Sequence, residues 1–295
     1  MKNLLCSLLV AVVAVSAVLV LNNPLAQASA VEKKALVVVS FGTTFPEARQ
    51  NDIEGIENAL KKAFPDREFK RAFTSKIVMK RMLENQGIKV NDLETTLKEL
   101  KAEGYQDILI QPTHLIHGEE YEQKVLGTVN KFAKDFAKVS IGKPLMAEEK
   151  DYAVVAEALA TQFPALAKNE AVILMGHGSP RDNNQSFGNT YKKLQATFDA
   201  AKLPVLIGVV EEVDHPNFED MYAMFKDRGY KSAVFMPLMV VSGDHANNDM
   251  AGAEDDSWKS MIEKDGYAAK VQFGGIGRNA AVQALYVNHA LEALK

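Results

Sequence analysis

Two histidines follow long apolar runs, the place where buried strands deliver functional side chains. His177 follows "AVILMG" and lies between Gly176 and Gly178, and His245 follows "AVFMPLMVVSGD". Neutral imidazole binds first-row divalent metals and accepts protons near neutral pH. The two rings therefore indicate a metal site or an acid–base site, with an ordinary strand-end turn as the alternative for His177. Asp244 and Asp249 are both candidates to orient the ring of His245.

Acidic side chains follow two other apolar runs. Glu119, Glu120 and Glu122 come after "DILIQPTHLIHG", and Glu211 and Glu212 come after "VLIGVV". Carboxylates in a cleft can take up protons or bind a metal. The alternative for the first group is a solvated helix N-terminus, where the helix dipole favours acids, and for the second a solvated loop.

The remaining histidines and glycines give weaker signals. His114 and His117 are three residues apart, but the pattern there is strand-to-loop, so joint binding of one metal is not expected. His215 and His289 have the setting of surface or packing residues. "GGIGRN" (274–279) lacks the spacing of a dinucleotide-binding fingerprint.

The elements that must position these residues alternate in type along the chain. Continuous apolar runs are typical of parallel strands covered on both faces, and amphipathic segments lie between them. Such alternation predicts an α/β fold with mainly parallel sheets flanked by helices. The predicted strands are 35–40, 107–112, 171–176, 205–210 and 233–238, and the predicted helices are 45–64, 90–104 and 217–229.

The chain also contains an internal repeat. Residues 104–120 match residues 229–245 at a constant offset of 125, with identical Gly, Tyr, Pro and Gly at four positions. Residues 34–44 similarly resemble 170–180, which places Phe41 opposite His177. We expect two similar lobes, residues 31–145 and 146–295, around a cleft. Glu120 falls opposite His245 in the repeat. Because ligands bind beyond the carboxyl ends of parallel strands, the cleft is expected to hold His177, His245 and Glu120.

The N-terminus predicts export. Lys2 is followed by an apolar run from 4 to 21, a helix breaker and small residues in A-x-A spacing, so residues 1–30 are expected to be a cleaved signal peptide and the protein periplasmic. The alternative is an uncleaved membrane anchor. Cleavage would remove Cys6, the only cysteine, which excludes disulfides and thiolate chemistry. After cleavage no stable membrane insertion is expected.

Composition excludes several classes of protein. The formal net charge is −4 and the chain has no basic stripe, so a nucleic-acid partner is not expected. The chain has neither the G-x-x-x-x-G-K-[ST] loop of ATP-binding proteins nor the G-x-S-x-G elbow of serine hydrolases. Neither ATP use nor serine hydrolysis is expected.

Long motifs along the mature chain resemble one known family, the anaerobic CbiK cobaltochelatases among the class II chelatases. The motifs are "LVVVSFGTT", "RAFTS", the His-x-x-x-Gly-x-Glu-Tyr-Glu run at 114–122, "MGHG", "MPLMVVSGDHANNDM" and "DSWK". The resemblance implies ATP-independent insertion of Co²⁺ into sirohydrochlorin, a tetrapyrrole, in a cleft between two α/β lobes. It also implies metal binding by His177 and His245, an active-site role for Glu120, and a further metal-binding carboxylate at Glu211.

The export signal departs from this family, because cobalamin synthesis is cytoplasmic. Fe²⁺ is therefore an alternative metal, and a periplasmic protein that binds or delivers a metal or tetrapyrrole is the alternative function. Some cytoplasmic relatives have asparagine where His117 stands, so His117 is a candidate haem ligand. The carboxylates of sirohydrochlorin are expected to meet basic residues, with Arg71, Lys76 and Arg181 as candidates. The sequence leaves the oligomeric state open, a homo-oligomer included.

Overall fold

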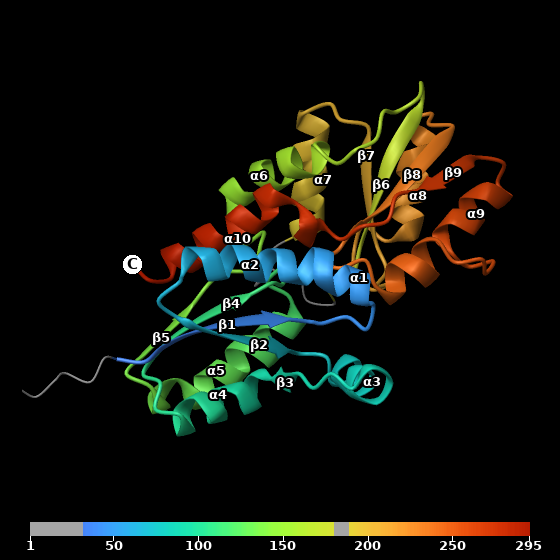
Figure 1. The fold of residues 1–295 in the computed structure, drawn as a ribbon. Helices are drawn as coiled ribbons and strands as arrows, with labels where there is room; N and C mark the ends of the chain where they lie inside the picture. The colour runs from blue at the N-terminus through green and yellow to red at the C-terminus, as the bar shows by residue number, and fades with distance from the viewer. Residues whose placement is uncertain (1–31, 180–188) are drawn as a thin grey trace, which may run out of the picture. The chain divides into compact units, whose positions relative to one another are not determined.

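Figure 1 shows the computed structural model, which describes residues 32–179 and 189–295. The expected signal peptide, residues 1–30, lies outside the described residues. Among the residues that are described, no helix is both long and apolar enough to cross a membrane.

Two parallel sheets form the framework. The first has the order β3-β2-β1-β4-β5 and the second the order β7-β6-β8-β9. Equating β6 with β1, β7 with β2, β8 with β4 and β9 with β5 makes the second order identical to the first without its edge strand β3. The strands are β1 (Lys34–Ser40), β2 (Glu68–Phe73), β3 (Asn91–Asp92), β4 (Asp107–Pro112), β5 (Lys138–Ile141), β6 (Glu170–Gly176), β7 (Val205–Val209), β8 (Ser232–Leu238) and β9 (Ala268–Val271).

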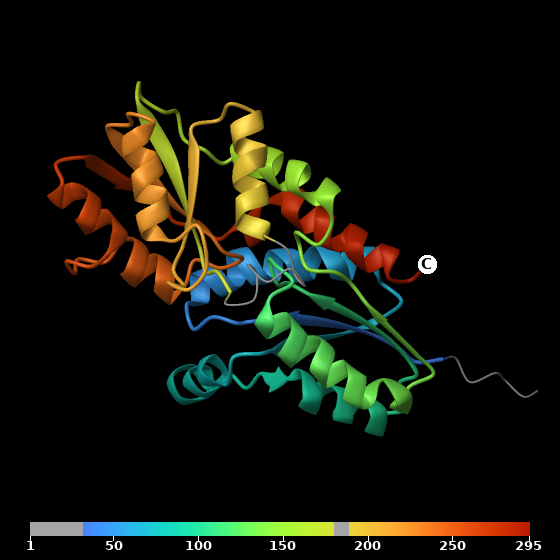
Figure 2. The same ribbon diagram turned by 180° about the vertical axis from the view of Figure 1, so that it is seen from behind.

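Helices connect the strands and cover both faces of each sheet (Figures 1 and 2). Short π- and 3₁₀-turns, labelled η, extend or join several of them. The helical elements are α1 (Pro46–Ala48), η1 (Arg49–Ile53), α2 (Glu54–Ala63), α3 (Lys76–Gln86), α4 (Leu93–Ala102), η2 (Tyr121–Leu126), α5 (Gly127–Phe132), η3 (Ala133–Asp135), α6 (Glu149–Ala160), α7 (Thr190–Ala200), α8 (Phe218–Asp227), η4 (Ala246–Met250), α9 (Trp258–Lys264), η5 (Ile276–Arg278) and α10 (Ala280–Glu292).

One central core joins the two sheets. Helices α2, α6 and α10 contribute to it, and α2 and α10 run between the sheets in Figure 1. Because side chains alternate along a strand, Leu36 and Val38 of β1 enter this core, whereas Val37 and Val39 enter a second core beneath α4 and α5. The second sheet is built in the same way, with α8 and α9 covering its outer face. Burial on both faces explains why the central strands are continuously apolar.

The predicted fold class is confirmed, and each predicted strand and helix is present. Asp92 caps α4 by accepting a hydrogen bond from the Thr95 amide at 2.8 Å. Strands β2, β3, β5 and β9 were not predicted. All four are short or partly exposed, so they lack the apolar run that identified the others. The lobe boundary at residue 145 stays a prediction, although the strands divide between 34–141 and 170–271.

Candidate functional site

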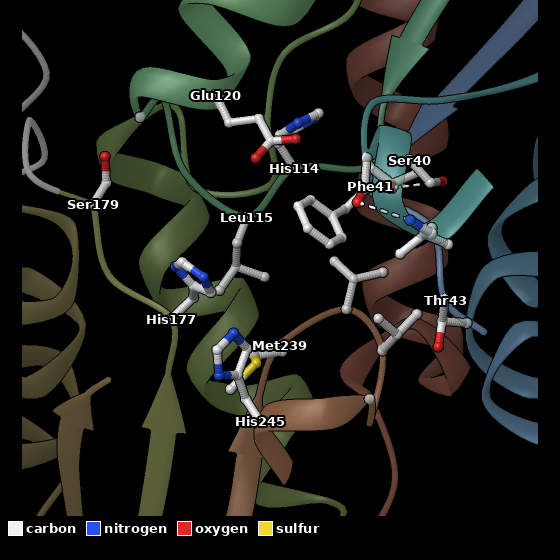
Figure 3. Close-up of a pocket in the computed structure, with 18 of the residues that line it drawn as sticks. Ser40, Phe41, Thr43, His114, Leu115, Glu120, His177, Ser179, Met239 and His245 are labelled. Atoms are coloured by element: carbon white, nitrogen blue, oxygen red, sulfur yellow. Dashed lines mark hydrogen bonds between the residues drawn. The ribbon is translucent and has the colours of Figure 1, made fainter. Parts of the chain in front are cut away.

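The site lies where the strand order of each sheet reverses direction, between β1 and β4 in one and between β6 and β8 in the other. Such switch points open a crevice beyond the carboxyl ends of the strands, where ligands bind. Phe41 follows β1, His177 follows β6, and Glu120 and His245 lie beyond β4 and β8. All four line one cavity of about 740 Å³ (Figure 3). Its size is that of a typical small-molecule site.

The two predicted imidazoles are neighbours in this cavity. The ring centroids of His177 and His245 are 4.9 Å apart, with an interplanar angle of 83°. The structure therefore brings together residues separated by 68 positions in the sequence. It does so because β6 and β8 pair in parallel, with Gly176 beside Leu238.

Hydrogen bonds determine which nitrogen each ring presents. Nδ1 of His177 lies 3.0 Å from the carbonyl oxygen of Gly178, and Nδ1 of His245 lies 2.7 Å from Oδ2 of Asp249. A carbonyl and an ionised carboxylate only accept hydrogen bonds, so each Nδ1 must carry the proton. A ring whose proton is on Nδ1 alone keeps its lone pair on Nε2, and among the described residues neither Nε2 has a hydrogen-bond partner. This is the arrangement usual in histidines that bind metals. Of the two aspartates proposed to orient His245, the structure selects Asp249.

The glycines on either side of His177 are required by packing. Gly178 has φ of +85°, and a Cβ there would lie 3.0 Å from the Cβ atoms of Val209 and Glu211. A Cβ at Gly176 would lie 2.5 Å from the ring of Tyr191. The repeat extends to this detail, since Gly42, opposite Gly178, has φ of +98°. The loop geometry that presents His177 thus depends on residues without side chains.

Glu120 occupies the position in the first lobe that His245 occupies in the second. Each residue immediately precedes a π-turn, η2 or η4. The Thr74 hydroxyl donates a hydrogen bond to Oε1 of Glu120. Figure 3 shows Glu120 across the cavity from the two imidazoles. The backbone N–H of Glu119 also donates to Ser179 Oγ at 3.2 Å, which joins this loop to the one that follows His177.

Glu211 also lines the cavity and lies near His177. Its Oε1 is 3.9 Å from Nδ1 of His177, the nitrogen already bonded to Gly178. Among the described residues, no group of three or more His, Cys, Asp or Glu side chains is arranged to hold a metal ion. The structure thus provides an imidazole pair, and binding of the metal by Glu211 stays a prediction.

His114 was not predicted to belong to this site. It follows β4 closely and lines the cavity, and neither ring nitrogen has a hydrogen-bond partner among the described residues. Part of the residue is exposed, but both nitrogens are buried, and burial lowers the pKa of His114 to about 4. Its ring is neutral at pH 7. Its place just after a buried strand is the same signal that identified His177.

The cavity wall is largely apolar, with Phe41, Leu115 and Met239 turned toward the space in Figure 3. Phe41 is 48% exposed, large for an aromatic ring, because it faces this opening. Charged side chains are few, and acids outnumber bases among the described lining residues. They are Arg81, Glu119, Glu120, Lys124, Glu211 and Asp244.

The basic residues of the lining differ from those expected. Arg71 pairs with Glu57 and Glu54, and neither Arg71 nor Lys76 is among the lining residues. Arg181 lies outside the described residues. The described basic residues of the lining are Arg81 and Lys124. Nη1 of Arg81 lies 3.5 Å from Oδ2 of Asp244, which comes from the other half of the chain.

His117 is not among the residues that line the cavity. Its Nε2 lies 2.8 Å from Oε2 of Glu122, and its ring meets the edge of Tyr121 with centroids 4.7 Å apart. The side chain is 37% exposed. His117 is therefore separate from the site formed by His177 and His245.

The sequence is similar to proteins of known function along most of its length. Residues 34–295 match the family model described as cobalt chelatase (CbiK). The chain belongs to the CbiK cobalt chelatase family. It is 37% identical over 262 residues to the sirohydrochlorin cobaltochelatase of Salmonella typhimurium, covering 89% of this chain and 97% of that protein. It is 28% identical over 268 residues to the sirohydrochlorin cobaltochelatase CbiKC of Nitratidesulfovibrio vulgaris, covering 89% and 91%.

The fold is shared more widely than the sequence. The solved structure of the sirohydrochlorin chelatase SirB from Bacillus subtilis subspecies spizizenii, in complex with cobalt, superposes with a TM-score of 0.58 at 15% identity. The match covers 88% of this chain and 95% of SirB. The chain therefore has the two-sheet architecture of the chelatase fold that its sequence predicts.

The hydrogen bond between Asp249 and His245 gives a first prediction. Replacing Asp249 with Asn lets the amide donate to Nδ1 and so favours the wrong tautomer. We expect Co²⁺ to bind about 10- to 100-fold more weakly, as when a partner that orients a metal-binding histidine is lost. Titration followed by Co²⁺ absorbance measures this. Asp244→Asn is the matched control, since Asp244 is adjacent to His245 but pairs with Arg81; equal losses in both variants would contradict the assignment.

Burial of neutral His114 gives a prediction about pH. The unfolded chain takes up a proton at this residue below pH 6.5, whereas the folded protein does not until about pH 4. Stability should therefore fall as the pH drops through this range. From pH 7 to 5 the contribution is about 2 kcal/mol. Urea unfolding of the wild type and of His114→Phe at both pH values tests it, and the variant should lose less stability. An identical pH dependence would contradict a neutral, buried ring.

Proposed function

We propose that this protein is an ATP-independent chelatase that inserts Co²⁺ into sirohydrochlorin and releases two pyrrole protons. The observation that carries the proposal is the pair of imidazoles, 4.9 Å apart, each with its Nδ1 bonded to an acceptor. Family membership and the named activities of both cobaltochelatase relatives support it.

The metal enters as a substrate and must leave the protein again. Two neutral nitrogen donors are suitable for a first-row divalent cation and leave most of its coordination positions open. Pyrrole nitrogens can then replace water on the metal. Acids outnumber bases along the described lining, so the local charge attracts a cation to the rings.

Metal insertion requires proton acceptors, because two pyrrole N–H groups lose their protons as the metal–nitrogen bonds form. Glu120 is the candidate acceptor on the side of the cavity facing the imidazoles. Thr74 donates a hydrogen bond to one of its oxygens, and the other has no hydrogen-bond partner among the described residues. Glu211, 40% exposed, is the candidate to pass protons to water.

The apolar wall is suited to the face of a flat macrocycle. Phe41, Leu115 and Met239 offer surface for the ring, and its carboxylates are then directed to the mouth and to water. Arg81 and Lys124 are the described cations within reach of those carboxylates.

The proposal predicts cobalt-dependent turnover. Mixing the protein with sirohydrochlorin and Co²⁺ should change the ring absorbance faster than the uncatalysed reaction does. His177→Ala and His245→Ala should each reduce the rate at least about 100-fold, the effect of losing a metal-binding group at the reaction centre. His215→Ala is the matched control, because His215 pairs with Asp220 and is not part of the cavity lining.

The same assay distinguishes the alternatives. A protein that only binds and delivers a metal or tetrapyrrole would bind both without accelerating insertion. Faster insertion of Fe²⁺ than Co²⁺ would favour an iron chelatase that uses the same site. Unchanged rates in both histidine variants would exclude this cavity as the site of reaction.

We also propose that the protein acts in the periplasm after removal of residues 1–30. The proposal rests on Lys2, the apolar run and the A-x-A spacing of the N-terminus. Expression in a Gram-negative host should give a periplasmic protein whose N-terminus, measured by mass spectrometry, follows Ala28 or Ala30. Full-length protein retained in the membrane fraction would contradict cleavage.

Haem binding by His117 stays a prediction. The residue is half-exposed and outside the cavity lining, but its Nε2 is bonded to Glu122. A haem iron would have to displace that carboxylate.

A further inference from the structure

The glycine-rich segment at 274–277 has no part in the chemistry above, yet it lies against the chain that leads to His245. The backbone N–H of Ile276 donates to the Met239 carbonyl at 2.9 Å, and that of Gly277 donates to the Val240 carbonyl at 3.0 Å. These bonds align the segment beside the connection from β8 to His245. The connection has no sheet partner of its own after Leu238.

A buried carboxylate completes this arrangement. Asp52, in the π-turn η1, has no exposed surface. Its Oδ2 accepts hydrogen bonds from the backbone N–H groups of Ser242 at 3.2 Å and Gly275 at 3.1 Å. Its Oδ1 accepts from Nε of Arg278 at 2.7 Å. All three donors come from the second half of the chain, so both oxygens serve to join a first-lobe helix to the loops around His245.

The contact leaves no room for larger residues. A Cβ at Gly275 would lie 2.2 Å from the Val240 carbonyl oxygen and 2.5 Å from Oδ2 of Asp52. A Cβ at Gly277 would lie 2.5 Å from the Asp52 carbonyl oxygen. The glycines therefore permit close backbone approach, which explains a motif that resembled a nucleotide-binding loop without its spacing.

Hydrogen bonds and a short stretch of backbone connect Asp52 to His245. Ser242 is followed by Gly243, whose carbonyl accepts hydrogen bonds from the backbone N–H of Asn247 at 3.2 Å and from its side chain at 2.7 Å. His245 lies inside this turn. Val241 also packs against Ile53, the neighbour of Asp52. The first lobe thus fixes the position of a second-lobe imidazole.

We propose that Asp52, with Arg278 and Gly275, is a positioning element that holds His245 in the metal-binding geometry with His177. Asp52 is not among the residues that line the cavity, so it acts through the 239–245 segment. Because η1 belongs to the same lobe as Glu120, the element also fixes the position of the metal-binding pair relative to the proton acceptor. This role rests on the proposed function, which makes the imidazole pair the place where Co²⁺ is held.

The test compares two buried aspartates, each paired with an arginine. Asp52→Asn leaves a single acceptor oxygen for three donors. The variant therefore loses either the two backbone hydrogen bonds from Ser242 and Gly275 or the hydrogen bond from Arg278. Asp107→Asn is the matched control. Asp107 is 7% exposed and bonds Arg67 at 2.8 and 3.0 Å, but it begins β4, at the opposite end of the strand from the site. Co²⁺ absorbance titration without tetrapyrrole, and urea unfolding, are measured for both.

Asp52→Asn should weaken Co²⁺ binding about 10- to 100-fold and raise the KM for Co²⁺, the cost of misplacing a metal-binding histidine. Asp107→Asn should lower stability but leave Co²⁺ affinity unchanged. Equal Co²⁺ affinities in the two variants, or no Co²⁺ binding by the wild type, would overturn the inference. A wild type that binds Co²⁺ but does not insert it would instead refute the proposed function alone.

Three further variants test the proposal if Asp52→Asn does not fold. Gly275→Ala keeps every charge but forces Val240 and Asp52 away, so it should weaken Co²⁺ binding about tenfold or more. Arg278 is 35% exposed, and Arg278→Lys keeps a cation beside Asp52. It should retain more Co²⁺ affinity than Arg278→Ala. Wild-type affinity in Gly275→Ala and Arg278→Ala would overturn the positioning role.

Discussion

The site depends on the tautomer that two acceptors impose on two neighbouring imidazoles. Gly178 and Asp249 each accept a hydrogen bond from an Nδ1, and both Nε2 atoms are without a hydrogen-bond partner in the part of the chain that the structure describes. Reversing either tautomer would present an N–H to the metal and remove a ligand. The rest of the molecule can be understood as what holds these rings and acceptors in place: glycines that fit only without side chains, parallel strands of matched length and a buried carboxylate between the lobes.

The architecture also reconciles two conflicting demands. A divalent cation is attracted by acids, whereas a substrate with many carboxylates is repelled by them. The wall of the cavity is largely apolar, and acids outnumber bases along the described lining. The basic side chains among the described lining residues are Arg81 and Lys124. Under the proposed function, the macrocycle enters with its face against apolar surface while its carboxylates stay in water. Two neutral ligands hold the metal less firmly than a closed set of four, which suits a metal that must be passed on.

Much of this arrangement could be predicted from the sequence, because the repeat and the buried strands are encoded locally. The continuous apolar runs located β1, β4, β6, β7 and β8, and the offset between the halves placed Glu120 opposite His245. Both residues precede π-turns in equivalent places. The short edge strands escaped prediction because their residues are partly exposed and carry no long apolar run.

Side-chain partners were harder to predict, because they depend on contacts between distant segments. Asp244 and Asp249 are both close to His245 in sequence, and only the geometry of the turn selects Asp249. Nothing near Asp52 indicates that it bonds Ser242 and Gly275, some 190 and 223 residues away. His114 was not assigned to the site, because its spacing from His117 gives only a weak metal-binding signal, although it follows β4 as closely as a strand-end residue does.

The most direct test of the account is a crystal structure of the protein soaked with Co²⁺, with the metal located by anomalous scattering at the cobalt edge. We predict one cobalt ion bound by Nε2 of His177 and Nε2 of His245, with each Nδ1 still bonded to its acceptor. Cobalt bound through either Nδ1, or bound away from both rings while this cavity holds none, would contradict the central claim.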